Sequence, residues 1–146
     1  ELSAADPSGA GVFFTLDQDP SKPPRLTRDR GDPYVKQLLA HVRKGTAGQL
    51  TDQLLVAALV EARSCERFAL ITPRLDDELG RFYAGLLASE ARHFLHYLEL
   101  AREFAGNGLE ARIDAVRQVE NVLATEPDTE LRFHSGPPDR AVTPAT

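Results

Sequence analysis

Apolar residues recur at helical spacing in two long runs of the chain, which meet near Pro73. Within each run, residues three or four positions apart share one face of a helix, and that face is largely apolar. In the first run the face consists of Leu54, Ala58, Glu61, Cys65, Phe68 and Thr72. In the second run it consists of Leu79, Phe82, Leu86, Glu90, His93, Tyr97, Leu100 and Phe104. The pattern predicts an antiparallel pair of helices whose buried faces include two carboxylates and an imidazole.

The carboxylates and the imidazole lie at similar distances from the turn that joins the two helices. With a rise of about 1.5 Å per residue, Glu61 lies roughly 16 Å before the turn and Glu90 roughly 21 Å after it. These depths differ by about one helical turn, and His93 follows Glu90 on the same face. We therefore expect Glu61, Glu90 and His93 to meet at one level of a helical core.

Shorter patterns predict one further helix on each side of this hairpin. Asp32 and Pro33 form a helix start, with aspartate as the N-cap and proline at the first position, and the helix would run to about Lys44. A fourth apolar pattern covers residues 109–124, after the glycine-rich stretch 106–108 has ended the second long helix. No long β-type alternation occurs, so the predicted class is all-α.

The two ends of the chain differ in composition from its middle. Residues 1–32 are rich in Pro, Gly and Asp and predict an irregular N-terminal segment, and residues 125–146 predict an extended C-terminal tail. The helices fall within residues 33–124, which form one helical domain. The first residue is Glu rather than Met, so we expect the sequence to be either part of a longer protein or a processed form.

The composition of the chain also predicts the cellular compartment in which the protein works. A single Cys excludes an internal disulfide and suits a reducing compartment. The sequence contains no run of about 18 apolar residues that would predict a membrane span. It also lacks the charged and then apolar N-terminal stretch that would indicate a signal peptide. We therefore expect a cytoplasmic protein without membrane contact.

Charge is unevenly distributed along the chain. The formal net charge is −5, which disfavours a nucleic-acid partner. Residues 21–50 nevertheless hold seven basic side chains against the acidic Asp29 and Asp32. Two interpretations are open: a surface that contacts RNA phosphates, and an ordinary solvated face. The basic residues are Lys22, Arg25, Arg28, Arg30, Lys36, Arg43 and Lys44.

The inward-facing carboxylates need a compensating partner. An ionised carboxylate in a core is costly unless it is paired or bound to a metal. Ferritin-like two-iron bundles use a Glu from each of two helices and a Glu-x-x-His from each of two others. Carboxylates with imidazole favour iron or manganese, whereas structural zinc sites usually recruit thiolates. The alternative interpretation is an ion pair of a buried Glu with Arg63, Arg67 or Arg92, with His93 packed in the core.

Two stretches, EARSCERF at 61–68 and SEARHF at 89–94, resemble the MiaE-type tRNA hydroxylases. The similarity extends over about residues 27–138 and includes the tail motif ELRFHSG. The resemblance implies a ferritin-like fold and a non-haem di-iron centre that uses dioxygen and an external electron donor. It also implies a tRNA substrate, in which the isopentenyl group of 2-methylthio-isopentenyladenosine is hydroxylated. Carried over by motif, the metal ligands would be Glu61, Glu90 as the bridging carboxylate, and His93.

The sequence departs from the family pattern in its N-terminal third. The family has an earlier pair of helices with another Glu and another Glu-x-x-His. In residues 1–50 of this sequence the only glutamate is Glu1, and no Glu-x-x-His occurs. Three explanations are open. The chain belongs to a longer protein, two copies complete a site across a homodimer, or iron binding is lost. The last would leave a catalytically silent binding or dimerisation module. In the isolated chain, the hairpin side that those helices would cover is expected to be an exposed apolar patch that invites self-association.

Overall fold

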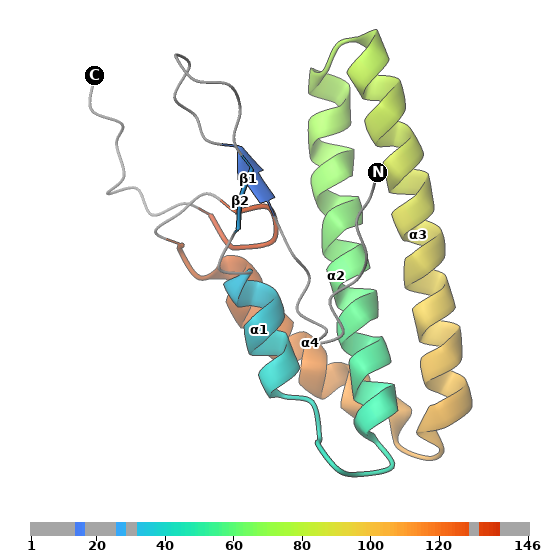
Figure 1. Ribbon diagram of the computed structural model, residues 1–146. Coiled ribbons are helices and arrows are strands. Elements are labelled where there is room, and N and C mark those ends of the chain that lie inside the picture. The colour runs from blue at the N-terminus through green and yellow to red at the C-terminus, as the bar shows by residue number, and fades with distance from the viewer. Residues whose placement is uncertain (1–13, 17–25, 29–31, 129–131, 138–146) are drawn as a thin grey trace.

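The structure, a computed structural model, describes residues 14–16, 26–28, 32–128 and 132–137 (Figure 1). Within these ranges a small β-hairpin precedes a set of helices that lie side by side. The α-helices are α1 (Pro33–Ala40), α2 (Gln49–Ile71), α3 (Asp77–Ala105) and α4 (Leu109–Thr125). The strands are β1 (Phe14–Leu16) and β2 (Leu26–Arg28), which pair antiparallel, and a 3₁₀ turn, η1 (Thr72–Arg74), joins α2 to α3. The predicted all-α class is confirmed, with this short β-ribbon as an addition.

The long helices α2 and α3 pack antiparallel along their length, as the apolar pattern predicts (Figure 1). The start of α3 is fixed by Asp76, whose side chain accepts hydrogen bonds from the backbone N–H groups of Glu78 (3.1 Å) and Leu79 (2.9 Å). Its end is fixed by Gly106, with φ of 57°. None of the helices in the described ranges is both long and apolar enough to cross a membrane.

Helix α1 is shorter than predicted, because it ends at Ala40 rather than near Lys44. Its start is as expected, with Asp32 accepting a hydrogen bond from the backbone N–H of Tyr34 at 2.9 Å. The chain leaves the helix so that the backbone N–H and the guanidinium of Arg43 both reach the carboxylate of Asp52. A contact with a distant residue therefore overrides the local helical pattern.

The hydrophobic core lies where α1, α2 and α4 meet the last turns of α3. Its buried members are Tyr34, Leu38, Val42, Leu55, Val56, Ala101 and Val116. The predicted burial of the whole apolar stripe of α3 is wrong, because Ala101 is the one buried residue of this helix. Phe82 remains 59% exposed and Phe104 54% exposed. Periodicity identifies residues that share a face, but within the described ranges nothing covers this side of the hairpin.

The described part of the C-terminal tail, residues 132–137, docks against α2. Arg63 donates hydrogen bonds to the backbone carbonyl oxygens of His134 (3.3 Å) and Ala124 (2.9 Å). Arg67 donates to those of Phe133 (3.1 Å) and Ser135 (2.7 Å). Side chains of α2 thus hold these residues of the tail in place.

Candidate metal centre

Glu61 on α2 and Glu90 and His93 on α3 lie together at one level of the hairpin. Each offers one possible ligand atom, and these atoms all lie within 4.8 Å of one another. The Nδ1 atom of His93 is 3.1 Å from a carboxylate oxygen of Glu90 and 3.9 Å from one of Glu61. The hairpin therefore brings the three side chains together as their spacing predicts. Their role as metal ligands stays a prediction.

This cluster is less buried than the sequence suggests. The side chains of Glu61 and Glu90 are 19% and 21% exposed, and that of His93 is 53% exposed. The cluster therefore opens to solvent on the side of the hairpin where Phe82 and Phe104 are also exposed. None of the described residues covers the open side of the cluster.

The two carboxylates share their environment and shift each other's pKa values in opposite directions. Burial, together with the hydrogen bond to Glu90 and its charge, raises the pKa of Glu61 to about 8. The hydrogen bond from Glu61, and to a smaller extent contact with His93, lowers the pKa of Glu90. At neutral pH the two carboxylates therefore share one proton. A divalent cation would displace that proton and bind both carboxylates.

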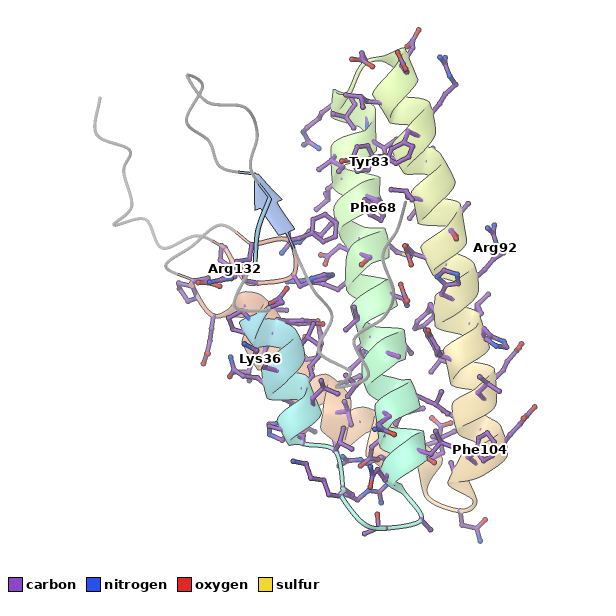
Figure 2. All side chains as sticks on the ribbon, viewed as in Figure 1. Lys36, Phe68, Tyr83, Arg92, Phe104 and Arg132 are labelled. Atoms are coloured by element: carbon purple, nitrogen blue, oxygen red, sulfur yellow. The ribbon has the colours of Figure 1, made fainter. Side chains whose placement is uncertain are left out.

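The basic side chains proposed as alternative partners of these carboxylates are placed elsewhere. Arg63 and Arg67 hold the tail, and Arg63 also pairs with Glu66. Arg92 lies on the side of α3 that faces away from α2 (Figure 2). Two carboxylates and an imidazole without a Lys or Arg partner among the described residues form a donor set that fits iron or manganese.

Cys65 lies one turn beyond Glu61 on α2 but does not join this donor set. Burial, and then the charges of Glu90 and Glu61, raise the pKa of its thiol. The sulfur lies 3.9 Å from the backbone oxygen of Leu87. A protonated thiol is a poor metal ligand, so Cys65 serves as a packing residue between the helices.

A mainly apolar cavity of about 390 Å³ lies between α2, α3 and α4. Ala62 and Phe94 line it and directly follow Glu61 and His93 in the sequence. The other lining residues are Leu55, Ala58, Leu59, Leu98, Arg102, Ile113, Val116 and Arg117. Phe94 lines this cavity, whereas Phe68 lies elsewhere and packs against Tyr83 (Figure 2).

The predicted basic surface is described only in part. Lys22, Arg25 and Arg30 lie outside the described residues, and Arg28 is described by its backbone alone as the last residue of β2. Lys36 and Lys44 both line a shallow depression of about 520 Å³ beside α1. Arg43 is bound to Asp52 at 2.7 Å.

Asp52 is an important residue whose role the sequence pattern does not reveal. Its side chain is fully buried and accepts hydrogen bonds from Arg43 (2.7 and 2.9 Å) and Arg112 (2.8 Å). Burial alone would raise the pKa of Asp52, but the hydrogen bonds from both guanidinium groups hold it well below its usual range. Arg112 is sixty residues away in the sequence, so no local pattern indicates the contact.

His134, in the tail motif RFHSG, joins three parts of the chain. Its Nδ1 lies 2.8 Å from Asp32 and its Nε2 lies 3.2 Å from the hydroxyl of Ser64 on α2, and its ring stacks on Tyr34. Burial opposes ionisation of Asp32, but the hydrogen bond with His134 keeps the pKa of Asp32 below its ordinary value. Ser64 is buried, so this chain of hydrogen bonds anchors the tail to the start of α1.

The family model described as tRNA-(MS[2]IO[6]A)-hydroxylase (MiaE) matches residues 25–135. The chain belongs to the MiaE family. The match includes the hairpin, the three clustered side chains and the docked tail as far as Ser135, and the helical fold agrees with the ferritin-like fold expected for this family.

Two curated proteins of this kind are similar to the chain. It is 49% identical over 123 residues to the tRNA 2-(methylsulfanyl)-N(6)-isopentenyladenosine(37) hydroxylase of Pseudomonas putida, covering 78% of this chain and 60% of that protein. It is 47% identical over 105 residues to the protein of the same name from Salmonella typhimurium, covering 72% and 39%. The chain thus matches less than two thirds of the length of either relative.

Proposed function

We propose that the chain carries half of the ligand set of a di-iron tRNA hydroxylase. The reaction would add oxygen to the isopentenyl group of 2-methylthio-isopentenyladenosine in tRNA. One observation carries this proposal: Glu61, Glu90 and His93 each place a ligand atom within 4.8 Å of the others, and no Lys or Arg of the described residues pairs with them. Membership of the MiaE family supports the substrate class, as do the printed names of the two relatives.

Iron bound at this cluster would supply dioxygen activation with electrons from an external donor. In the overall reaction a C–H bond of the prenyl group breaks and a C–O bond forms. One oxygen atom enters the product, and the other leaves as water with two electrons and two protons. Glu61 and Glu90 would release their shared proton when a cation binds, so that both carboxylates could serve as ligands.

The rest of the described surface offers places for the parts of the substrate. The apolar cavity beside Ala62 and Phe94 has the size of a small-ligand pocket and suits a prenylated base. Lys36 and Lys44 share one depression and would contact tRNA phosphates together. We assign the same role to the other basic residues of the N-terminal region, which are Lys22, Arg25, Arg28 and Arg30. Arg43 would contribute through those guanidinium N–H groups that do not bind Asp52.

The test is hydroxylation by the purified chain loaded with Fe(II), in the presence of ¹⁸O₂ and a chemical electron donor. The substrate is tRNA that contains the 2-methylthio-isopentenyl nucleoside, and the product is measured by mass spectrometry of the digested nucleosides. We expect one labelled oxygen atom in the modified nucleoside. A chain that holds a complete two-iron centre and still leaves the nucleoside unchanged would contradict the proposal.

Two pairs of variants on α3 separate the ligands from ordinary surface charges. Glu90→Ala and His93→Ala should lose both bound iron and product, because each removes a donor atom from the cluster. Glu99→Ala and His96→Ala change exposed residues of the same helix and should retain both. If iron content and hydroxylation survive Glu90→Ala and His93→Ala, the ligand assignment is wrong. A folded wild-type chain that binds no iron would favour a catalytically silent binding module.

A further inference from the structure

The cavity between α2, α3 and α4 is apolar except for two guanidinium groups. Arg102 of α3 and Arg117 of α4 line it, and its other lining residues all have apolar side chains. None of the described residues that line the cavity is acidic. Its volume of about 390 Å³ lies within the range of small-molecule pockets. A ligand that satisfies this lining therefore has an apolar body and an anionic group.

Arg102 and Arg117 are free to bind such an anionic group. Both are exposed, and neither forms a hydrogen bond or an ion pair with another described residue. In contrast, the guanidinium groups of Arg43 and Arg112 are bound to the carboxylate of Asp52. A guanidinium group binds a phosphate group through two parallel hydrogen bonds. Because a phosphate group has enough oxygen atoms for two such contacts, it is the anion that suits this pair of arginines.

The two arginines lie at the end of the cavity that is remote from the metal cluster. Phe94 lines the end at the level of that cluster, and Arg102 lies eight residues further along α3, about 12 Å at the rise of a helix. The residues directly before the two arginines, Ala101 and Val116, belong to one buried cluster. The arginines therefore start from neighbouring parts of α3 and α4. The cavity thus has an apolar end beside the metal cluster and a cationic end.

We propose that Arg102 and Arg117 bind a phosphate group of the modified nucleotide, while its isopentenyl and methylthio groups occupy the apolar end of the cavity. The inference rests on the substrate proposed above and adds its orientation and two specificity-determining residues. From a phosphate group to the tip of the isopentenyl chain, an extended nucleotide is comparable in length to the separation of the two ends. The prenyl group would then lie at the level of the metal cluster.

The chemistry of the lining favours this orientation of the nucleotide. The isopentenyl and methylthio groups carry no N–H or O–H group, so their burial among apolar side chains leaves no donor unpaired. The apolar end offers no side-chain donor or acceptor for the polar edges of an adenine base, which therefore stay near solvent. The reverse orientation would bury a charged phosphate group among apolar side chains, which is costly.

The experiment is calorimetric titration of the metal-free 1–146 chain at low ionic strength with two compounds. One is 2-methylthio-isopentenyladenosine, and the other is its 3′,5′-bisphosphate, which carries both phosphate groups that flank the nucleoside in RNA. We expect the bisphosphate to bind about tenfold more tightly, a moderate gain because solvent screens ion pairs of exposed arginines. Equal affinities for the two compounds, or no binding of the bisphosphate, would overturn the inference.

Variants of the two arginines test their assignment. Arg102→Gln and Arg117→Gln should each remove most of the advantage of the bisphosphate and leave the affinity for the nucleoside unchanged. The matched control is Arg92→Gln, because Arg92 is also exposed on α3 but does not line the cavity. This variant should bind both compounds like the wild type. An advantage of the bisphosphate that survives both cavity substitutions would contradict the role of the arginines.

A second pair of variants tests the apolar end. The wild-type chain should bind the prenylated bisphosphate at least about tenfold more tightly than adenosine 3′,5′-bisphosphate. Ala62→Leu narrows the apolar end and should lose most of this preference. Ala69→Leu adds the same side chain at an exposed position of α2 outside the cavity and should keep it. If Ala62→Leu is folded by circular dichroism and keeps the preference, the prenyl group is bound elsewhere and the inference fails.

Failure of this inference and failure of the proposed hydroxylation give different results. If a complete two-iron centre hydroxylates the prenylated nucleoside in tRNA but the phosphate groups add no affinity, the assignment of the two arginines is wrong and the proposed function stands. If the arginine-dependent affinity is found but that centre leaves the nucleoside unchanged, the nucleotide site stands and the proposed reaction fails.

Discussion

Asp52 and Glu61 are carboxylates nine residues apart on the same helix, yet their surroundings differ in almost every respect. Asp52 is fully buried and is bound by two guanidinium groups, which keep its pKa well below the usual range. Glu61 is partly exposed, faces another carboxylate, and has a pKa raised to about 8. The comparison separates two uses of charge in one small domain. A carboxylate with its own cations stabilises the fold, and one without them is available for a ligand.

The same contrast holds for the two sides of the hairpin. On one side of α2, Arg63 and Arg67 bind the tail, and Ser64 reaches His134. On the other side, the cluster of Glu61, Glu90 and His93 opens to solvent among exposed apolar side chains. The stability of the domain should therefore depend on the first side and its metal affinity on the second.

Removing the carboxylate of Asp52 should have the largest effect on stability. Asp52→Ala leaves two guanidinium groups without their buried partner and should reduce the free energy of unfolding by about 3–5 kcal/mol. Glu61→Ala, on the same helix, should change it by less than about 1 kcal/mol in the metal-free protein. Denaturant unfolding monitored by circular dichroism measures both. Equal losses for the two variants would remove the distinction between structural and ligand carboxylates.

Disturbing the docked tail should have an intermediate effect. A Cβ atom at Gly136 would lie 2.0 Å from the backbone oxygen and 2.9 Å from the backbone carbon of Glu126. Gly136→Ala therefore forces the backbone apart and should cost about 1–3 kcal/mol. The control is Gly85→Ala in α3, where the added methyl group meets no atom of the described residues within 4 Å apart from the adjacent residues and the nearby backbone of its own helix. This substitution should stabilise the helix by up to about 1 kcal/mol. If Gly136→Ala is tolerated as well as Gly85→Ala, the tail is not held as described.

The smallest effect expected is a pH dependence of opposite sign at the two carboxylates. The folded protein raises the pKa of Glu61 from 4.5 to about 8, so the folded state holds a proton that the unfolded state has released. In the metal-free protein this contribution is fully present below about pH 4.5 and is lost as the pH rises towards 8. The contribution of Asp52 is instead lost as the pH falls below 3.8, because its folded pKa is lowered.

In the metal-free protein, the free energy of unfolding of Glu61→Gln should therefore vary less between pH 5 and 8 than that of the wild type. The difference should be about 1 kcal/mol, because solvent screens the partly exposed carboxylate. Asp52→Asn should leave the pH dependence of the free energy of unfolding unchanged between pH 5 and 8. It should instead alter the loss of stability at acidic pH. Thermal unfolding across the pH range is the measurement. A wild-type profile that is flat from pH 5 to 8 would contradict the shared proton.

Much of this arrangement follows from the sequence, because helical periodicity is a local property. The spacing of Glu61 from Pro73 and of Glu90 beyond it predicts that the two carboxylates meet, and they do. Periodicity does not reveal what covers a face, so the predicted burial of Phe82 and Phe104 is wrong. Contacts between distant residues are equally hidden.

The early end of α1 illustrates that second limit. The apolar pattern continues to Val42, but Arg43 leaves the helix to bind Asp52, which also binds Arg112 from α4. Likewise, nothing near His134 in the sequence indicates that it bonds to Asp32 and Ser64. Three-dimensional placement was needed to assign the charges of this domain to structure or to ligand binding.

The central claim is that Glu61, Glu90 and His93 bind the same metal centre. The most direct measurement is anomalous X-ray scattering at the iron absorption edge, from crystals of the chain grown with Fe(II). The account predicts a peak within bonding distance of all three side chains on the open face of the hairpin, which disappears in Glu90→Ala. A peak at any other group of side chains, with none at this cluster, would contradict it.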